Sequence, residues 1–163
     1  MSRSNSRFLH AWCTLKIAKV HSVSRDALPG KRGLGLVYHG GKPMVWGKGA
    51  VAGGFVFLSG AEARDEKTDE PLHGIKAQTE LALGRIKERL EEAGTSLDNV
   101  VKFVWYLSDR TLEKEFYDAR DGWLVKNAPK LLKERSYAST LLIVGLAKYD
   151  MLVEIDCIAA MPE

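Results

Sequence analysis

Glu154 is the residue whose sequence setting most favours chemistry. It lies in the strand-like run 151–160, where alternation places it on one face with Leu152, Asp156 and Ile158. An acid on an otherwise apolar face is costly to bury without a partner. The carboxyl group is therefore either a pocket acid that handles water or a structural partner in a subunit contact, and both interpretations stay open. For Asp156 we favour a structural role.

Ser59 is the second candidate, because it follows the apolar segment 55–58 and precedes Gly60. A serine nucleophile needs a base within hydrogen-bond reach, and the sequence identifies none. We therefore expect Ser59 to be a turn residue that makes hydrogen bonds in a pocket wall.

The sequence contains no motif for metal binding or for redox chemistry. The two cysteines, Cys13 and Cys157, are far apart, and the four histidines show no metal-ligand spacing. We expect no metal and no cofactor. Cys157 lies in an apolar run, where a small buried side chain is the expected role.

Composition narrows the class of protein. The chain has 163 residues, 45% of them hydrophobic, which is enough for one domain with a core. A net charge of +3 with both signs mixed argues against binding to nucleic acid. No apolar run approaches the ~20 residues of a membrane span. We expect a cytoplasmic protein, although the basic segment before Asp26 also has the composition of an organellar transit peptide.

Two helices and several strands must position the candidate residues. Apolar spacing predicts one helix over 75–93, closed by Gly94, and a second that Asp109 or Thr111 caps and that ends before Pro129. Strands are predicted over 55–58, 100–107, 139–146 and 151–160, and the short turn 147–150 predicts a hairpin between the last two. Residues 1–42, which include a strand-like stretch at 14–20, are interpreted as an N-terminal extension, and residues 43–163 as the domain.

This order of elements predicts an α+β fold with one mixed or antiparallel sheet and two helices on one of its faces. The other face then needs a cover. We expect neighbouring subunits to supply it by packing against Phe103, Trp105, Val153 and Ile155.

Several segments, in order and at matching spacing, resemble the Rid/YjgF family of reactive intermediate deaminases, also called endoribonuclease L-PSP. They are residues 55–60 (FVFLSG), 78–79 (QT), 90–102 (LEEAGTSLDNVVK), 107–109 (LSD) and 153–159 (VEIDCIA). The resemblance covers about residues 45–161. It implies a chorismate-mutase-like fold, a homotrimer with a central barrel, and pockets between subunits. Members of the family hydrolyse small enamines and imines without a cofactor, using an arginine for the substrate carboxylate and a glutamate for water.

Only some of the family's functional residues are present at the matching positions of this sequence. Glu154 matches the catalytic glutamate, and Ser59 and Gly60 match the pocket lining. The family arginine, however, falls at Ala138, and the usual asparagine falls at Tyr117. The pocket tyrosine falls near Trp46, and Thr140 stands where some members have cysteine.

Alanine cannot bind a carboxylate, so the usual imino-acid hydrolysis should be poor unless another cation substitutes. Arg135, Lys133 and Arg64 are the candidates for that substitution. Trp46, Tyr117 and Tyr137 would make the pocket more aromatic, which favours a larger or flatter ligand.

Three functions follow as hypotheses. The first is a divergent hydrolase or deaminase of a small enamine or imine, with Glu154 acting on water. The second is a non-catalytic trimer of the same fold that binds or senses a metabolite. The third, an RNA-directed protein, is disfavoured by the near-neutral charge.

Overall fold

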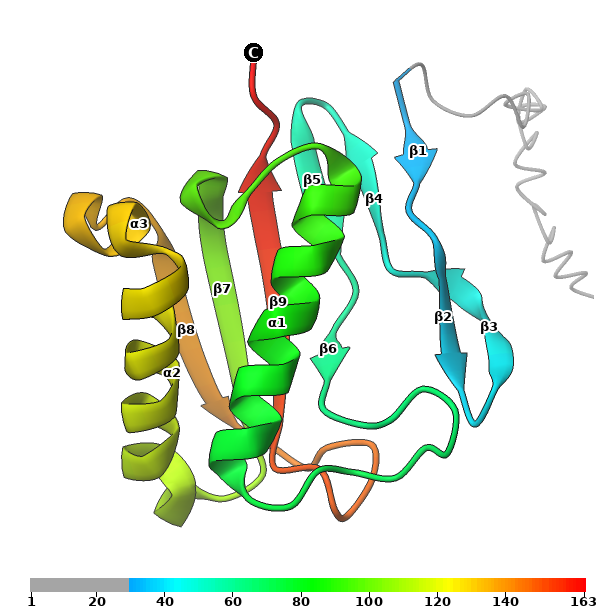
Figure 1. Cartoon of the computed structure of the whole chain (residues 1–163), viewed down its shortest axis with the longest axis vertical. Coiled ribbons are helices and arrows are strands. Elements are labelled where there is room, and N and C mark those ends of the chain that lie inside the picture. The colour runs from blue at the N-terminus through cyan, green and yellow to red at the C-terminus, as the bar shows by residue number, and fades with distance from the viewer. Residues whose placement is uncertain (1–29) are drawn as a thin grey trace, which may run out of the picture.

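The computed structural model describes residues 30–163. The predicted stretch 14–20 and the basic segment before Asp26 lie outside the described residues. A twisted sheet forms one layer, and two long helices form a second layer on one side of it (Figure 1). Within the described range, no helix is long and apolar enough to cross a membrane. This is the predicted α+β arrangement, with two main helices on one face.

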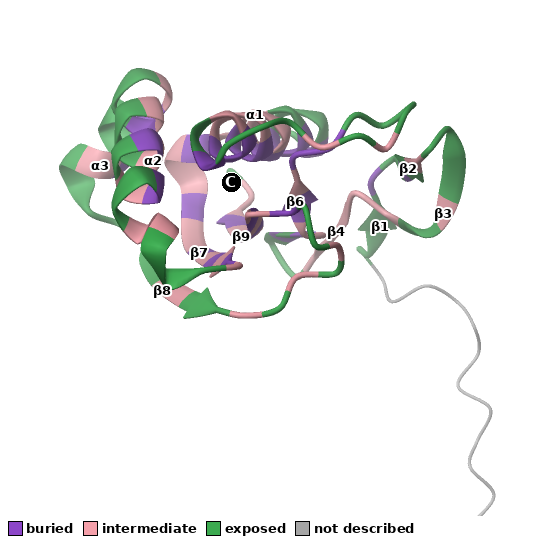
Figure 2. Ribbon diagram, turned by 90° about the horizontal axis from the view of Figure 1, so that it is seen from below, coloured by how far each residue is buried: buried purple, intermediate pink, exposed green. Residues whose placement is uncertain are grey.

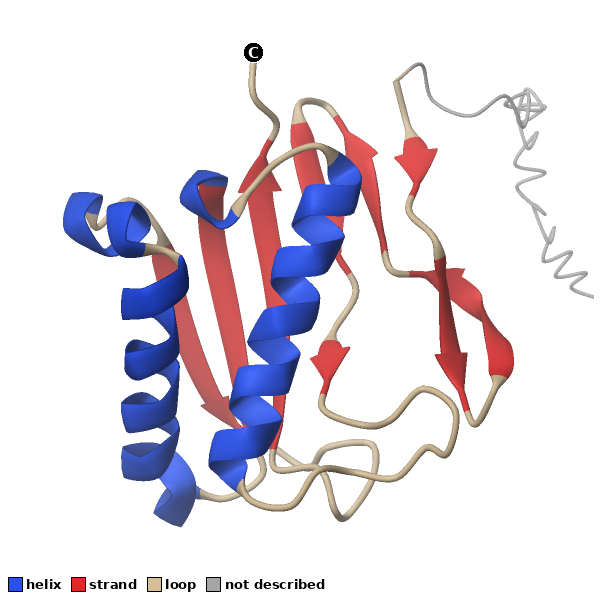
Figure 3. Cartoon of the chain, viewed as in Figure 1, coloured by secondary structure: helices blue, strands red, loops and turns tan. Residues whose placement is uncertain are grey.

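The sheet is mixed, and its order is β1-β4-β5-β9-β7-β8, with β6 also paired to β9 (Figure 3). A separate two-stranded sheet is formed by β2 and β3. The strands are β1 (Arg32–Gly33), β2 (Leu36–His39), β3 (Lys42–Gly47), β4 (Gly49–Ala52), β5 (Phe55–Leu58), β6 (Ala61–Glu62), β7 (Val100–Leu107), β8 (Ala138–Ile143) and β9 (Val153–Ala160).

The predicted hairpin between the last two strands is wrong. β7 lies between β8 and β9, pairing in parallel with β8 and antiparallel with β9. The parallel pair needs a crossover, which the second and third helices supply between β7 and β8. The turn after β8 therefore carries the chain past β7 before β9 begins.

The helix α1 (Ile75–Ala93) has the predicted bounds. The positions of its predicted apolar stripe recur every three or four residues and are buried, and Gly94 ends it in the left-handed region at φ 92°. The 3₁₀ turn η1 (Leu97–Asn99) leads into β7, and η2 (Arg110–Leu112) leads into α2 (Glu113–Asn127). The Asp109 carboxylate caps η2 by accepting from the Thr111 amide. A short helix that the sequence analysis missed, α3 (Pro129–Glu134), starts with the proline.

The core lies between the helices and one face of the sheet, which we call the helix-covered face; the opposite one is the open face. Figure 2 shows the buried residues of α1 and α2 turned toward the sheet. Phe103, Trp105, Val153 and Ile155 are each 0% exposed and belong to this core cluster. Our expectation that they face other subunits is therefore wrong. Both faces of β7 are apolar in sequence, so alternation alone does not show which face the helices cover.

Residues 30–42 join the rest of the chain through main-chain pairing. β1 pairs with β4, and β2 pairs with β3. The Leu34 amide donates to the Gly49 carbonyl over 2.9 Å, and the Leu34 side chain packs in the core cluster. The Ser59 amide donates to the Lys48 carbonyl over 3.0 Å, so the end of the β2–β3 hairpin is tied to the segment that carries Ser59.

Candidate functional site

Four of the predicted site residues, Trp46, Ser59, Gly60 and Glu154, line one cavity of about 210 Å³. Its walls come from the β2–β3 hairpin, the segment from Ser59 to Asp69, α1 and β9. The other lining residues are Val37, Tyr38, His39, Glu62, Arg64, Asp65, Glu66, Asp69, Arg85 and Arg89. Segments distant in sequence thus meet around the predicted acid.

Glu154 lies on the open face of β9, directly opposite Glu62 of β6. It is half-buried, and its Oε1 is so near Gly60 that a Cβ at that position would overlap it. Burial raises the pKa of the Glu154 carboxyl, and the charges of Glu62 and Asp156 raise it further. Glycine at position 60 is therefore a steric requirement for this placement of the acid.

Ser59 forms part of the cavity wall. Its Oγ donates to the Gly47 carbonyl over 2.8 Å, which ties the end of β5 to the end of β3. Its own carbonyl accepts from Nη1 of Arg89 over 2.8 Å. The hydroxyl proton is thus used in a structural hydrogen bond to a main-chain oxygen.

Arg64 lines the cavity, but its guanidinium group already pairs with Asp69 and Asp150. Its Nε donates to Oδ1 of Asp69 over 3.1 Å, and its two terminal nitrogens bond the Asp150 carboxylate and the Asp69 carbonyl. Lys148 also pairs with Asp69, and the Lys148 contact together with Arg64 holds the pKa of the Asp69 carboxyl below its ordinary value. These pairs connect the loop after β6 to the loop before β9.

Two arginines of α1 were missed by the sequence analysis. Both terminal nitrogens of Arg85 bond main-chain carbonyls, those of Glu62 and Arg64, and Arg89 bonds Ser59 as described. Arg89 is only 6% exposed, and burial lowers its pKa. A signal was present, because Arg89 falls between Ile86 and Leu90 on the apolar side of the helix. The hydrogen bonds of these two arginines connect α1 to the ends of β5 and β6.

Aromatic side chains form the outer rim of the cavity. Trp46 is 46% exposed, and its ring meets His39 edge-on at a centroid distance of 6.3 Å. Tyr38, at 40% exposure, lines the same rim. His39 also lies 4.0 Å from Asp69 through Nδ1. An indole and a phenol at the entrance favour a flat or cationic ligand.

The remaining predicted site residues lie elsewhere in the chain. Ala138 and Thr140 are on β8, at the edge of the sheet, and Arg135 is an exposed residue that ends α3 in the left-handed region at φ 50°. Tyr117 packs on α2 against Phe116, with the Arg120 guanidinium 4.5 Å from its ring centroid. Neither Tyr117 nor Arg135 lines the cavity of Glu154.

The register gives the separation between Ala138 and Glu154. Ala138 is level with Lys102 on β7, which is level with Ile158 on β9, four residues beyond Glu154. Two strand spacings and four residue steps place Ala138 and Glu154 about 16 Å apart. Within one chain, a side chain at position 138 and the Glu154 carboxyl therefore do not share a ligand.

The family follows from comparison of the whole domain with known proteins. Residues 44–161 match the model of the family described as Endoribonuclease L-PSP. This chain belongs to that family. The family match begins inside β3, so β1 and β2, with Tyr38 and His39 of the cavity rim, precede it.

Relatives in sequence and structure agree with this placement of the family. A RutC family protein of Pyrococcus horikoshii is 34% identical over 109 residues, covering 66% of this chain and 80% of that protein. RidA of an Antarctic Psychrobacter is 27% identical with a TM-score of 0.63, covering 80% of this chain and 99% of RidA. Escherichia coli TdcF, crystallised with bound serine, has the same fold at 19% identity and a TM-score of 0.64, covering 80% and 94%. The Rid/YjgF fold is thereby shown.

Residues 30–163 contain no group of three or more histidine, cysteine or acidic side chains that could hold a metal ion. Cys157 is buried on the helix-covered face, where burial raises the pKa of its thiol above the ordinary value. Its predicted role as a small core residue is confirmed.

Proposed function

We propose that this protein hydrolyses the C=N bond of a small imine, or of an enamine after protonation, in a pocket between subunits of a homotrimer. The observation that carries the proposal is the half-buried carboxyl of Glu154 in the wall of the cavity. Its raised pKa and its enforced contact with Gly60 are features of a group held for proton transfer rather than for an ion pair. Membership of the Endoribonuclease L-PSP family supports the same reaction class.

The chemistry requires two proton transfers, and one carboxyl group can serve both. Water forms a bond to the imine carbon while the nitrogen takes a proton. The C–N bond then breaks, the nitrogen leaves with a further proton, and a carbonyl group remains. Because the raised pKa brings the protonated and ionised forms of Glu154 closer in population, the residue can donate one proton and accept another. An enamine first takes a proton on carbon from the same group.

The trimer is part of the proposal because the candidate residues lie in two separate places. β8, with Ala138 and Thr140, forms one edge of the sheet, and the cavity lies beyond β9. A second copy that packs against the open face would bring its β8 edge toward the first copy's Glu154. Exposed apolar side chains support such a contact, with Phe57 at 46% and Leu142 at 43% exposure.

A small metabolite is the ligand class that we propose, without metal or cofactor, and the cytoplasm is the location that we predict. The cavity volume of about 210 Å³ fits a small molecule better than a polymer. E. coli TdcF, which shares the fold, holds the small amino acid serine.

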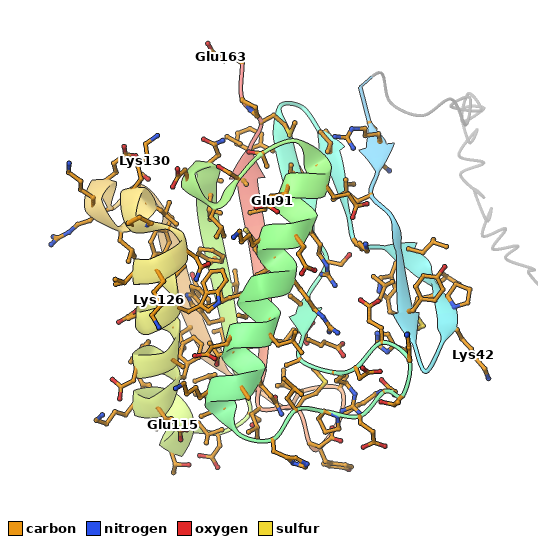
Figure 4. The ribbon with its side chains drawn as sticks, viewed as in Figure 1. Lys42, Glu91, Glu115, Lys126, Lys130 and Glu163 are labelled. Carbon is orange, nitrogen blue, oxygen red and sulfur yellow. The ribbon has the colours of Figure 1, made fainter. Side chains whose placement is uncertain are left out.

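A coupled assay tests the reaction. An oxidase generates an imine in place, and ammonia release is compared for the wild type, Glu154→Gln and Glu91→Gln. Glu91 is an exposed residue near the end of α1, labelled in Figure 4, and serves as the matched control. We expect Glu154→Gln to lower catalysis by about 100-fold or more and Glu91→Gln to leave it unchanged. Full activity of Glu154→Gln would sink the mechanism.

The second candidate is a non-catalytic trimer that binds a metabolite in the same cavity. Ala138 favours it, because the residue offers no cation at the position of the family arginine. A wild type that binds ligand by thermal shift but hydrolyses no imine from any oxidase would establish this alternative.

A further inference from the structure

We propose that the ligand of this cavity is a cation derived from a primary amine, namely a protonated imine that carries no carboxylate. This inference rests on the proposed function for the reaction, but the ligand class stands on the charges, contacts and aromatic rim of the cavity. It differs from the imino acids implied by the family resemblance.

The three arginines of the cavity already bond other groups of the protein. Arg64 and Arg89 are 8% and 6% exposed, and Arg64 is fully paired with Asp69 and Asp150. Arg85 directs both terminal nitrogens at main-chain carbonyls. A substrate carboxylate needs a free pair of parallel N–H donors. Arg64 and Arg85 present no such pair. Arg89 directs Nη1 at the Ser59 carbonyl, and its side chain is almost fully buried.

Two carboxylates of the cavity, those of Glu62 and Glu154, are free of ion pairs within the described residues. The lining described above contains five acidic residues and three arginines. Glu62 and Glu154 face each other across the β6–β9 pair, and among residues 30–163 neither takes part in an ion pair. Like charges placed directly opposite repel each other, and a bound cation relieves this repulsion.

The rim adds a second, independent preference for a cation. Trp46 and Tyr38 expose aromatic surface at the entrance, and His39 meets the Trp46 ring edge-on. Aromatic faces attract protonated nitrogen and flat apolar groups. A ligand with a protonated imine near Glu62 and Glu154 and an aromatic or aliphatic body against Trp46 satisfies both parts of the site.

The reaction balances for such a substrate. A protonated aldimine, R–CH=NH₂⁺, and water give the aldehyde R–CHO and ammonium. The C–N bond breaks, the aldehyde oxygen comes from water, and no oxidant or reductant is consumed. Oxidation of a primary amine supplies such a substrate, whereas oxidation of an amino acid leaves the carboxylate on the imine.

Binding is tested on the full-length protein by calorimetry with two probes that share a phenyl group, 2-phenylethylamine and 3-phenylpropanoate. We expect the amine to bind about tenfold more tightly than the propanoate. Glu62→Gln should weaken amine binding by about threefold, and the exposed control Glu91→Gln should leave it unchanged. Equal or tighter binding of the propanoate, no binding of either probe, or no effect of Glu62→Gln would overturn the inference.

Turnover separates this inference from the proposed function. A flavin amine oxidase converts 2-phenylethylamine, and an amino-acid oxidase converts phenylalanine, to imines that differ only in the carboxylate. With oxidase in excess, hydrolysis limits ammonia release, and we expect acceleration for the amine-derived imine alone. Acceleration for the phenylalanine imine alone keeps the proposed function and overturns the ligand class. Selective amine binding without acceleration of either keeps the ligand class and overturns the proposed function.

Discussion

The two faces of the sheet are built from alternate residues of the same strands, yet they differ in almost every property. On the helix-covered face, Trp105 and Ile155 are 0% exposed. On the open face, Tyr106 and Glu154 are partly exposed, and the Tyr106 hydroxyl donates to Oδ2 of Asp156 over 2.8 Å. One face contains apolar side chains in close contact, and the other collects carboxylates and a phenol.

Along one strand, residues that stabilise the fold alternate with residues that are available for function. The helix-covered face is completed by helices of the same chain, and the indole N–H of Trp105 bonds Oγ of Ser139 over 2.8 Å. The open face lacks such a cover within the described residues, and one of its acids, Glu154, lines the candidate site. Substitutions at neighbouring positions of one strand should therefore have unequal effects.

The largest expected effect comes from Trp105→Ala. Because this side chain is fully buried against Phe103 and Phe116, its removal should lower the free energy of unfolding by about 3–5 kcal/mol. Val104→Ala, one position away on the open face, should cost about 1 kcal/mol. Denaturant titration of both variants measures the contrast, and equal losses would contradict the distinction between the faces.

Gly60→Ala should give the next largest effect, on the open side. Its Cβ would overlap Oε1 of Glu154, so the acid or the strand must move, and we expect a loss of about 1–3 kcal/mol. Glu154→Ala removes the overlapping atoms. In a double-mutant cycle, the combined variant should lose less than the sum of the two single losses. Strict additivity would show that the contact is not the cause.

Tyr106→Phe sharpens the comparison by removing one hydroxyl from the open face. The hydrogen bond to Asp156 is partly exposed, so its loss should lower the free energy of unfolding by about 1 kcal/mol. The same variant made with Asp156→Asn measures the coupling between the two side chains. A cost above that of Trp105→Ala would reverse the ranking of the faces.

Glu154→Gln should have the smallest effect on stability, and the size of this effect depends on pH. Because the folded-state pKa is raised above the unfolded value, the folded protein holds more protons in the interval between the two values. Stability from this group is present below the unfolded pKa and is lost as pH rises through the folded pKa. The glutamine variant should therefore melt higher than the wild type at pH 7 and show no such gain at pH 4. Thermal melts at both values provide the measurement.

Local periodicity made part of this fold predictable. The bounds of α1 and β7 follow from apolar spacing and from Gly94, since each element has its own regular pattern. Strand order did not follow, because β8 and β9 have the same pattern whether they pair with each other or with β7. The apolar residues on both faces of β7 concealed the side on which the helices lie.

The candidate site was predictable where a short motif marks it. Ser59, Gly60 and Glu154 carry such motifs and meet at one cavity. Arg85 and Arg89 were missed because charged residues on an amphipathic helix are ordinarily solvated, and only the fold shows that these two reach the strand ends. Residues of β8 remain predictions, since their contribution depends on a second copy.

The position of β9 has a consequence for the synthesis of the protein. β9 follows every other strand in the chain, but it lies between β5 and β7 in the middle of the sheet. While the ribosome is still adding residues before Val153, at roughly 5–20 residues per second, the two halves of the sheet have no strand to join them. Until β9 is synthesised, the edges of β5 and β7 that it will pair with are open to pairing with other chains. Glu154 belongs to that strand, so the candidate acid and the completed sheet arise in the same step.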